Sequence, residues 1–173
     1  MPLVFVTGIS TSGKSAVARE LGKRGYRAYD TEQHGISAWH NKQTGERVAE
    51  LGGMPERNEE WLDQHEWLIS TDWLDRIAKK AQKELIFVCG GGANEAEARS
   101  RCDKVIWLKT DETTIRKRLQ NRRDHDYGTR PHELKRIVSG NRRGEIEYRE
   151  LSAEIVDATQ PLEKVVADIL SII

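Results

Sequence analysis

Short apolar runs alternate along the chain with longer stretches in which apolar residues recur every three or four positions. The short runs predict five strands, at residues 3–6, 27–29, 85–89, 105–108 and 154–156. The longer stretches predict helices, at residues 16–21, 58–83, 112–123, 132–152 and 162–170. Strands and helices that alternate in this order form a parallel sheet with helices on both faces. We therefore predict an α/β fold, a three-layer sandwich around a five-stranded parallel sheet.

The segment between the second and third predicted strands is longer than one crossover helix requires. Asn58, followed by two glutamates, is typical of a helix N-cap, so we predict a helix or a pair of helices from there to about Lys83. Residues 41–54 contain three glycines and precede Pro55, which predicts a loop or a hairpin. The helical stretch gathers its apolar residues on one side, which we expect to face the core: Trp61, Leu68, Trp73, Leu74 and Ile77.

The chain has 173 residues, which suits a single domain, residues 1–173, with its own core. Its 28 Lys and Arg residues balance 28 Asp and Glu residues, so we expect neither a nucleic-acid partner nor a membrane partner. Cys89 and Cys102 lack metal-ligand spacing, and the apolar runs are too short to span a bilayer. With no leader before the first strand, we expect a cytoplasmic protein, a monomer or a weak dimer.

One motif is specific enough to predict a ligand. The first strand runs into residues 8–15, GISTSGKS, which fit G-x-x-x-x-G-K-S, and a helix-forming run follows. In such a loop the backbone N–H groups surround phosphates, the lysine reaches the β- and γ-phosphates, and the serine ligates Mg²⁺. A plain turn would not need Lys and Ser after the second glycine, and the dinucleotide motif G-x-G-x-x-G is absent. We predict that ATP and Mg²⁺ bind at Gly8, Ser10, Thr11, Ser12, Gly13, Lys14, Ser15 and Ala16.

Residues that follow the other strands are the next candidates, because parallel sheets bind ligands beyond the carboxyl ends of their strands. Asp30 and Glu32 follow the second strand, and Gly91 and Gly92 follow the third. The third strand ends without a metal-side aspartate, so we predict that Asp30 holds Mg²⁺ together with Ser15. The alternative for Asp30 is a turn residue at a strand end.

Basic residues gather in the later turns of the predicted helix 112–123, among them Arg118 and Arg122. They either offset the helix dipole or bind phosphate. The polar stretch that follows contains a glycine and an Arg-Pro pair, which end the helix. We interpret residues 123–132 as a short lid that closes over the donor and brings Arg130 to the transferring phosphoryl group.

With these residues in place, the chain resembles the nucleoside, nucleotide and shikimate kinase group of P-loop kinases over nearly its whole length. Residues 30–32, DTE, resemble the Asp-Thr-Asp that follows the second strand of shikimate kinases. Residues 90–93, GGGA, resemble their triple-glycine turn, and Arg130-Pro131 their lid Arg-Pro. The resemblance implies a P-loop NTPase-type sandwich with a short lid and an inserted acceptor-binding segment, about residues 33–83.

A second likeness concerns the donor nucleotide. Residues 118–123, RLQNRR, are similar to the arginine cluster at which adenylate kinases begin their lid. That likeness implies adenine packing and phosphate contact for Arg118 and Arg122. The loop after the last strand resembles the one that flanks adenine in this group, which implies nucleotide contact for Thr159, Gln160 and Pro161.

The chain also departs from shikimate kinases. Their acceptor segment carries an arginine in a Gly-x-x-x-Phe-Arg context, whereas this segment offers Arg47 and Arg57 among tryptophans. The second carboxylate is Glu instead of Asp, and the spacing from Arg143 to Tyr148 differs by one residue. These differences indicate another acceptor, and one or two tryptophans are candidates for its pocket. Our acceptor-binding candidates are Asp30, Glu32, Arg47, Arg57, Gly91 and Gly92.

We expect a small-molecule kinase, shikimate kinase-like or nucleoside kinase-like, that transfers the γ-phosphoryl group of ATP to a hydroxyl. Glu32 would position or deprotonate that hydroxyl. The alternative is a nucleoside monophosphate kinase, in which Arg47 or Arg57 binds the acceptor phosphate. An ATP-binding regulatory protein without kinase activity and a nucleic-acid end kinase are further alternatives. The expected catalytic residues are Lys14, Glu32, Arg122 and Arg130.

Overall fold

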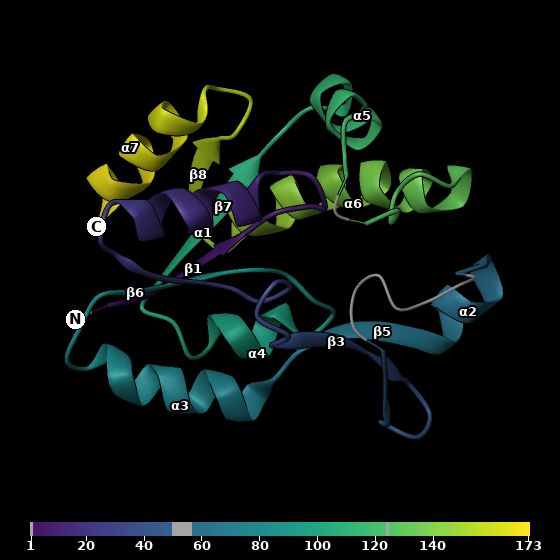
Figure 1. Ribbon diagram of the computed structural model, residues 1–173, viewed down its shortest axis with the longest axis horizontal. Coiled ribbons are helices and arrows are strands. Elements are labelled where there is room, and N and C mark those ends of the chain that lie inside the picture. The colour runs from purple at the N-terminus through teal and green to yellow at the C-terminus, as the bar shows by residue number, and fades with distance from the viewer. Residues whose placement is uncertain (1, 50–56, 124) are drawn as a thin grey trace.

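The central sheet is the predicted one. The computed structural model describes residues 2–49, 57–123 and 125–173. The strands of this sheet are β1 (Leu3–Thr7), β2 (Arg27–Asp30), β6 (Ile86–Cys89), β7 (Lys104–Lys109) and β8 (Glu154–Asp157). All pair in parallel in the order β2-β6-β1-β7-β8, which places β1 in the middle (Figure 1). The predicted five-stranded parallel sheet is confirmed, with strand ends within one residue of the predicted ones.

The described helices are α1 (Lys14–Lys23), α2 (Glu59–Gln64), α3 (Thr71–Ala81), α4 (Glu95–Arg99), α5 (Glu112–Gln120), α6 (Pro131–Glu150) and α7 (Leu162–Ile172). They lie on both faces of the sheet (Figure 1). Successive residues of a strand point to opposite faces. Val4 and Val6 therefore pack with α1 and α7, whereas Leu3 and Phe5 pack with α3 and α4. These two apolar layers are the core that fixes the loops at the carboxyl ends of the strands.

A second, antiparallel sheet was not predicted. Its strands are β3 (Ser37–Asn41), β4 (Arg47–Ala49) and β5 (His65–Ile69), in the order β4-β3-β5. β3 and β4 form a hairpin, as one of the two predictions for residues 41–54 had it; positions 50–54 lie outside the described residues. The small sheet lies beside the carboxyl end of the main sheet and extends the molecule away from both termini (Figure 1).

The prediction of a helix or helix pair over residues 58–83 is wrong in its middle. Two helices form, but β5 separates them, so Leu68 belongs to a strand and not to a helical stripe. β5 pairs with β3, and that partner lies far away in the sequence. The predicted N-cap is confirmed, because the Asn58 side chain accepts a hydrogen bond from the Trp61 N–H at 2.8 Å. Leu74 and Ile77 are buried in the core as predicted.

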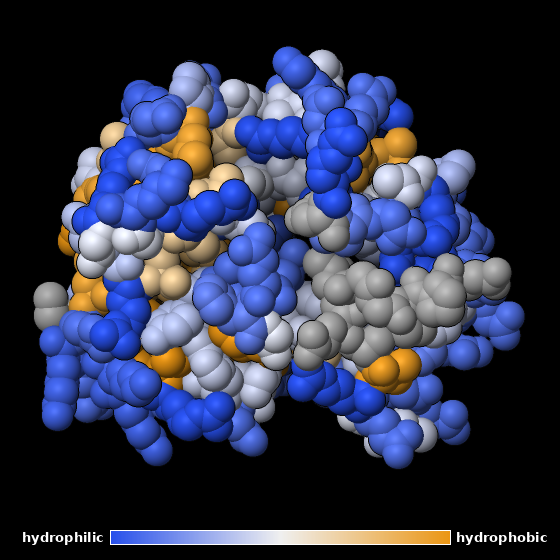
Figure 2. Space-filling model, viewed as in Figure 1, coloured by the Kyte–Doolittle hydropathy of each residue, from blue (hydrophilic) through white to orange (hydrophobic). Residues whose placement is uncertain are grey.

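The surface is mostly polar. Figure 2 shows a largely hydrophilic face in which apolar side chains form small separate patches. Within the described ranges, no helix combines the length and the apolar character needed to cross a bilayer.

Candidate active site

The loop between β1 and α1 is shaped by its glycines. Gly13 precedes α1 with φ 106° and ψ 13°, a left-handed conformation that favours glycine. A side chain at Gly8 would not fit, because its Cβ would lie 2.7 Å from Ser12 Oγ and 2.9 Å from Leu108 O. Thr11 also has a positive φ, 75°. The chain is therefore tightly curled just before the N-terminus of a helix, the arrangement that binds phosphate.

Lys14 lies inside this loop. Its Nζ donates hydrogen bonds to Gly8 O at 2.8 Å and to Ile9 O at 2.9 Å, and its side chain is buried. Burial lowers the pKa of the Lys14 ammonium below its ordinary value, and the nearby carboxylates of Glu32 and Glu95 oppose that effect. A buried ammonium held by neutral carbonyls is ready to bind anionic phosphate oxygens.

Two arginines of the α5 region, for which phosphate or nucleotide contacts were predicted, bind atoms of the loop itself. Arg118 Nη1 donates to Thr11 O at 2.9 Å and to Ser12 O at 3.0 Å, while its Nη2 donates to Ala158 O at 2.6 Å. Arg122 Nη1 donates to Ser10 Oγ at 3.2 Å. Arg118 thus joins the phosphate loop to the loop that follows β8, where the predicted nucleotide-binding residues are exposed: Thr159, Gln160 and Pro161.

The two carboxylate oxygens of Asp30 differ in their hydrogen bonds. Its Oδ1 accepts from the Glu32 N–H at 2.9 Å and from the Gln33 N–H at 3.1 Å. Its Oδ2 is buried and makes no hydrogen bond within the described part of the chain. Ser15 lies in the first turn of α1. No described cluster of three or more His, Cys, Asp or Glu residues could hold a metal alone. The residues fit Mg²⁺, which keeps waters and binds substrate phosphates beside a few oxygen ligands.

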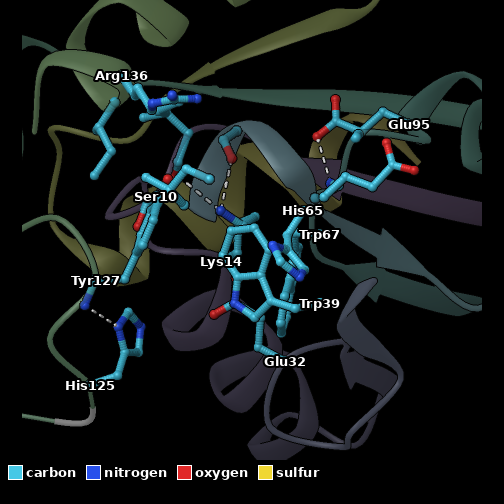
Figure 3. Close-up of a pocket in the computed structure, with 18 of the residues that line it drawn as sticks. Ser10, Lys14, Glu32, Trp39, His65, Trp67, Glu95, His125, Tyr127 and Arg136 are labelled. Carbon is cyan, nitrogen blue, oxygen red and sulfur yellow. Dashed lines mark hydrogen bonds between the residues drawn. The ribbon is translucent and has the colours of Figure 1, made fainter. Parts of the chain in front are cut away.

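A cavity of ≈ 490 Å³ opens beside the loop (Figure 3). Lys14 lines it from the phosphate loop, and Glu32 lines it from the turn after β2. The cavity brings together the predicted residues Gly8, Ser10, Lys14, Glu32, Gly91 and Gly92. Its other walls come from the small sheet, α2 and the segment before α6: Trp39, Leu62, His65, Trp67, His125 and Tyr127. Two of the tryptophans, Trp39 and Trp67, thus line the cavity that the predicted acceptor would enter.

The glycines after β6 allow their chain to approach the cavity closely. A Cβ at Gly92 would lie 2.9 Å from Trp67 O, and one at Gly90 would lie 2.1 Å from Thr31 Oγ1. Backbone and a buried side chain cannot move aside cheaply, so both positions require glycine. This close packing holds the turn after β6 against the small sheet.

Arg47, Arg57 and Arg130 do not line this cavity. Arg57 is buried, and it forms ion pairs with Glu133, at 2.9 Å, and with Asp126. Arg130 binds the same two carboxylates, at 3.2 Å and 3.1 Å. Arg47 is exposed and lines a separate hollow. The structure therefore joins Arg57 of the acceptor segment to Arg130 of the predicted lid through shared acidic partners.

The predicted lid lies between α5 and α6, and residue 124 is outside the described part of the chain. α5 ends at Gln120, three residues before the predicted end. Gly128 has φ 98°, and a Cβ there would lie 2.6 Å from Leu119 Cδ2. Tyr127 packs beside Ile137 and lines the cavity. This segment therefore contributes to the wall of the cavity.

A family model described as an AAA domain matches residues 4–149 of the chain. The chain belongs to this AAA-domain family. No match to a curated protein was found. The structure is similar to a shikimate kinase from Acinetobacter baumannii in complex with shikimate. The TM-score is 0.67 and the identity 19%, over 99% of this chain and 92% of that one.

Two other solved structures have the same architecture. A gluconokinase from Sinorhizobium meliloti 1021 gives a TM-score of 0.52 and 22% identity, over 97% of this chain and 89% of that one. A deoxyadenosine kinase from M. mycoides gives a TM-score of 0.55 and 12% identity, over 98% of this chain and 97% of that one. These likenesses establish the fold of the AAA-domain chain, that of P-loop kinases of the shikimate kinase type.

Sequence reasoning missed Glu95 and Tyr148. Glu95 Oε1 accepts from Thr7 Oγ1 at 2.9 Å, and the Tyr148 hydroxyl donates to Glu95 Oε2. Burial, followed by the nearby Glu95 carboxylate, raises the pKa of Tyr148. Glu95 lines the cavity, and its carboxylate opposes the lowering of the Lys14 pKa by burial. No local motif marks either residue, because α4 and α6 bring them together across 53 positions.

Proposed function

We propose that the chain is a kinase that transfers the γ-phosphoryl group of ATP to a hydroxyl of a small molecule. One observation carries this proposal: the phosphate-loop lysine, Lys14, and the carboxylate Glu32 line the same cavity. A phosphate loop beside a cavity that can hold an acceptor suits phosphoryl transfer, which depends on positioning and on charge stabilisation. The solved structures similar to this chain are named as kinases, which supports the proposal.

The donor side uses residues of three loops. The backbone of the phosphate loop would surround the phosphates of ATP, and Lys14 would bind the β- and γ-oxygens. Arg122, which contacts Ser10, would bind the transferring group, and Arg118, which contacts Ala158 O, would support the base beside residues 158–161. Ser15 and Asp30 would hold Mg²⁺, which neutralises charge on the phosphates when it is bound.

The acceptor side is assigned to Glu32, Gly91 and Gly92. The oxygen of an alcohol is a poor nucleophile at neutral pH, so a carboxylate within hydrogen-bond reach accelerates its attack. A monophosphate acceptor would instead need arginines. Arg57 is ion-paired outside the cavity, and this favours the hydroxyl over the nucleoside monophosphate alternative. A regulatory protein that only binds nucleotide would have no use for the acceptor cavity.

The variant Glu32→Gln is expected to lower kcat with a hydroxyl acceptor by about a hundredfold or more. The substitution keeps the shape of the side chain and removes the charge that orients the hydroxyl and takes its proton. Steady-state ADP formation with saturating ATP and Mg²⁺ measures the effect. Glu46→Gln, at an exposed position of the β3–β4 hairpin, serves as the matched control. Full activity of Glu32→Gln would remove Glu32 from the mechanism.

Binding of a non-hydrolysable ATP analogue with Mg²⁺ is expected to slow amide hydrogen exchange in residues 125–130. Closure of this segment would order its backbone and exclude water from the transferring group. Hydrogen exchange followed by mass spectrometry measures it, with the exposed turn at residues 42–45 as an internal reference. Unchanged exchange in residues 125–130 would contradict the lid assignment and leave donor binding itself intact.

A further inference from the structure

The acceptor cavity is rich in carboxylates. Glu32, Glu66 and Glu95 all line it. Lys14 lines it too, but its ammonium is held within the phosphate loop by Gly8 O and Ile9 O, on the donor side. In a partly enclosed site, like charges interact more strongly than in bulk water. An acceptor with its own carboxylate or phosphate would therefore meet repulsion from these three side chains.

The other described cations that line the cavity both donate hydrogen bonds to Asp63, Lys42 to its backbone carbonyl and Arg136 to its carboxylate. Lys42 and Arg136 are the only other described Lys or Arg residues that line it. Lys42 Nζ donates to Asp63 O at 2.8 Å, and Arg136 Nη2 donates to Asp63 Oδ1 at 2.6 Å. The Arg136 guanidinium holds the pKa of the Asp63 carboxyl below its ordinary range. Both cations are thus bonded to Asp63. Among the described residues, no pair of arginines lines the cavity that could hold an anion by two parallel hydrogen bonds.

Aromatic side chains form one wall of the cavity (Figure 3). Trp39, Trp67 and Tyr127 all line it. The ring centroids of Trp39 and Trp67 are 5.5 Å apart at 65°, and those of Trp39 and Tyr127 are 6.2 Å apart at 57°. Trp61 packs edge-on behind Trp39 at 5.0 Å. These side chains thus pack against one another along the cavity, and aromatic surfaces bind flat rings by stacking.

The polar groups on this side are suited to an uncharged partner. His65 Nδ1 lies 2.7 Å from Trp61 O, and a carbonyl only accepts, so Nδ1 carries the proton. In the neutral imidazole, Nε2 is then an acceptor. The Trp67 indole N–H is buried and donates to no described residue. Such groups pair with the hydroxyls and ring heteroatoms of a neutral molecule at no electrostatic cost.

Taken with the proposed function, on which this step rests, we infer that the acceptor is an uncharged alcohol that carries a flat ring system. The ring packs on Trp39, Trp67 and Tyr127, and the hydroxyl lies between Glu32 and Lys14. The hydroxyl oxygen bonds to the γ-phosphorus of ATP, and the bond from that phosphorus to the bridging oxygen breaks. ADP leaves, and the hydroxyl proton passes to Glu32. The cavity of ≈ 490 Å³ falls in the range of ligand pockets, about 300–1,000 Å³.

The test separates the effect of the acceptor's charge from the effect of its aromatic ring. Nucleosides are uncharged and carry a ring, their 5′-monophosphates carry the same ring with charge, shikimate and gluconate carry charge without an aromatic ring, and ribose carries neither. ADP formation with ATP and Mg²⁺ is measured for all of them. Nucleosides are expected to give a kcat/KM at least about tenfold above every other class. Preference for a monophosphate, an acid or ribose would overturn the inference.

The outcomes also separate this inference from the function on which it rests. If shikimate, gluconate or ribose mainly stimulates ADP formation, the proposed transfer to a hydroxyl is retained. The inference that the acceptor is uncharged or carries a flat ring is then wrong. Stimulation by monophosphates alone would discard the hydroxyl as well. ADP formation that no probe stimulates would contradict both. Tryptophan fluorescence of the wild-type protein, with ADP present to fill the donor site, reports nucleoside binding independently of turnover.

A substitution in the aromatic wall tests the placement of the ring. Trp67→Leu is expected to raise the KM for nucleosides about tenfold, with kcat changed much less. Trp73→Phe is the matched control, because Trp73 lies in α3 and packs on Tyr29 outside the cavity. Thermal melts show whether either variant is folded. An unchanged nucleoside KM and unchanged fluorescence quenching in folded Trp67→Leu would place the ring elsewhere and overturn the assignment.

Discussion

Lys14→Ala is expected to lower the rate of phosphoryl transfer by at least about a hundredfold while the fold stays intact. The side chain is buried, and its Nζ is the cation that the phosphate loop holds inside its own curve. In the variant, no Lys14 ammonium would stabilise the negative charge on the β- and γ-oxygens of ATP as the transition state forms. Burial lowers the pKa of the Lys14 ammonium, so its removal also relieves a desolvation cost.

Steady-state ADP formation measures the loss, and a thermal melt measures the fold. Lys23→Ala is the matched control, because Lys23 lies on the same helix with its side chain 70% exposed and forms an ion pair with Glu20 at 3.8 Å. The control should keep the wild-type rate. Wild-type turnover in Lys14→Ala would contradict the assignment of the donor site.

Arg57→Ala is expected to lower the free energy of unfolding by about 3 kcal/mol. Arg57 is 2% exposed, and Glu133, which accepts its Nε–H at 2.9 Å, is fully buried. Removal of the guanidinium leaves the buried Glu133 carboxylate with the partly exposed Arg130 as its one remaining ionic partner among the described residues. Arg57 also holds the pKa of the Asp126 carboxyl below its ordinary value, so that side chain loses its main partner too.

Urea denaturation followed by tryptophan fluorescence measures this effect. Arg116→Ala is the matched control, because Arg116 pairs with Glu112 at 2.7 Å on the surface of α5, with both side chains well exposed. Its expected cost is about 0.5 kcal/mol or less. If the two variants lose the same small amount of stability, the buried ion pair does not join the acceptor segment to the start of α6.

The parallel sheet and the donor loop could be predicted because local patterns determine them. Apolar runs between helical stretches marked all five strands of the main sheet. The N-cap of α2 could also be predicted, since Asn58 accepts from the Trp61 N–H at 2.8 Å as a typical N-cap does. G-x-x-x-x-G-K-S placed Lys14 in its loop for the same reason, because the two carbonyls that its Nζ binds lie six and five residues away.

The small sheet could not be predicted in this way. β5 carries apolar residues that continue the helical spacing of the segments around it, and only the partner strand β3 decides its conformation. Tertiary pairing then overrides local preference. The contacts of Arg57 and Glu95 could not be predicted for the same reason. Glu133, a partner of Arg57, is 76 residues away, and Tyr148, a partner of Glu95, is 53 residues away. Contacts at such separation leave no mark on a single sequence.

Following the γ-phosphoryl group of labelled ATP tests most directly whether this site transfers it to a hydroxyl. The protein is incubated with labelled ATP, Mg²⁺ and a hydroxyl acceptor, and the labelled products are separated. We predict label in a phosphate monoester of the acceptor, with one ADP formed for each ester and none formed by Lys14→Ala. Label found only in inorganic phosphate, at a rate that no acceptor changes, would contradict the proposed kinase activity.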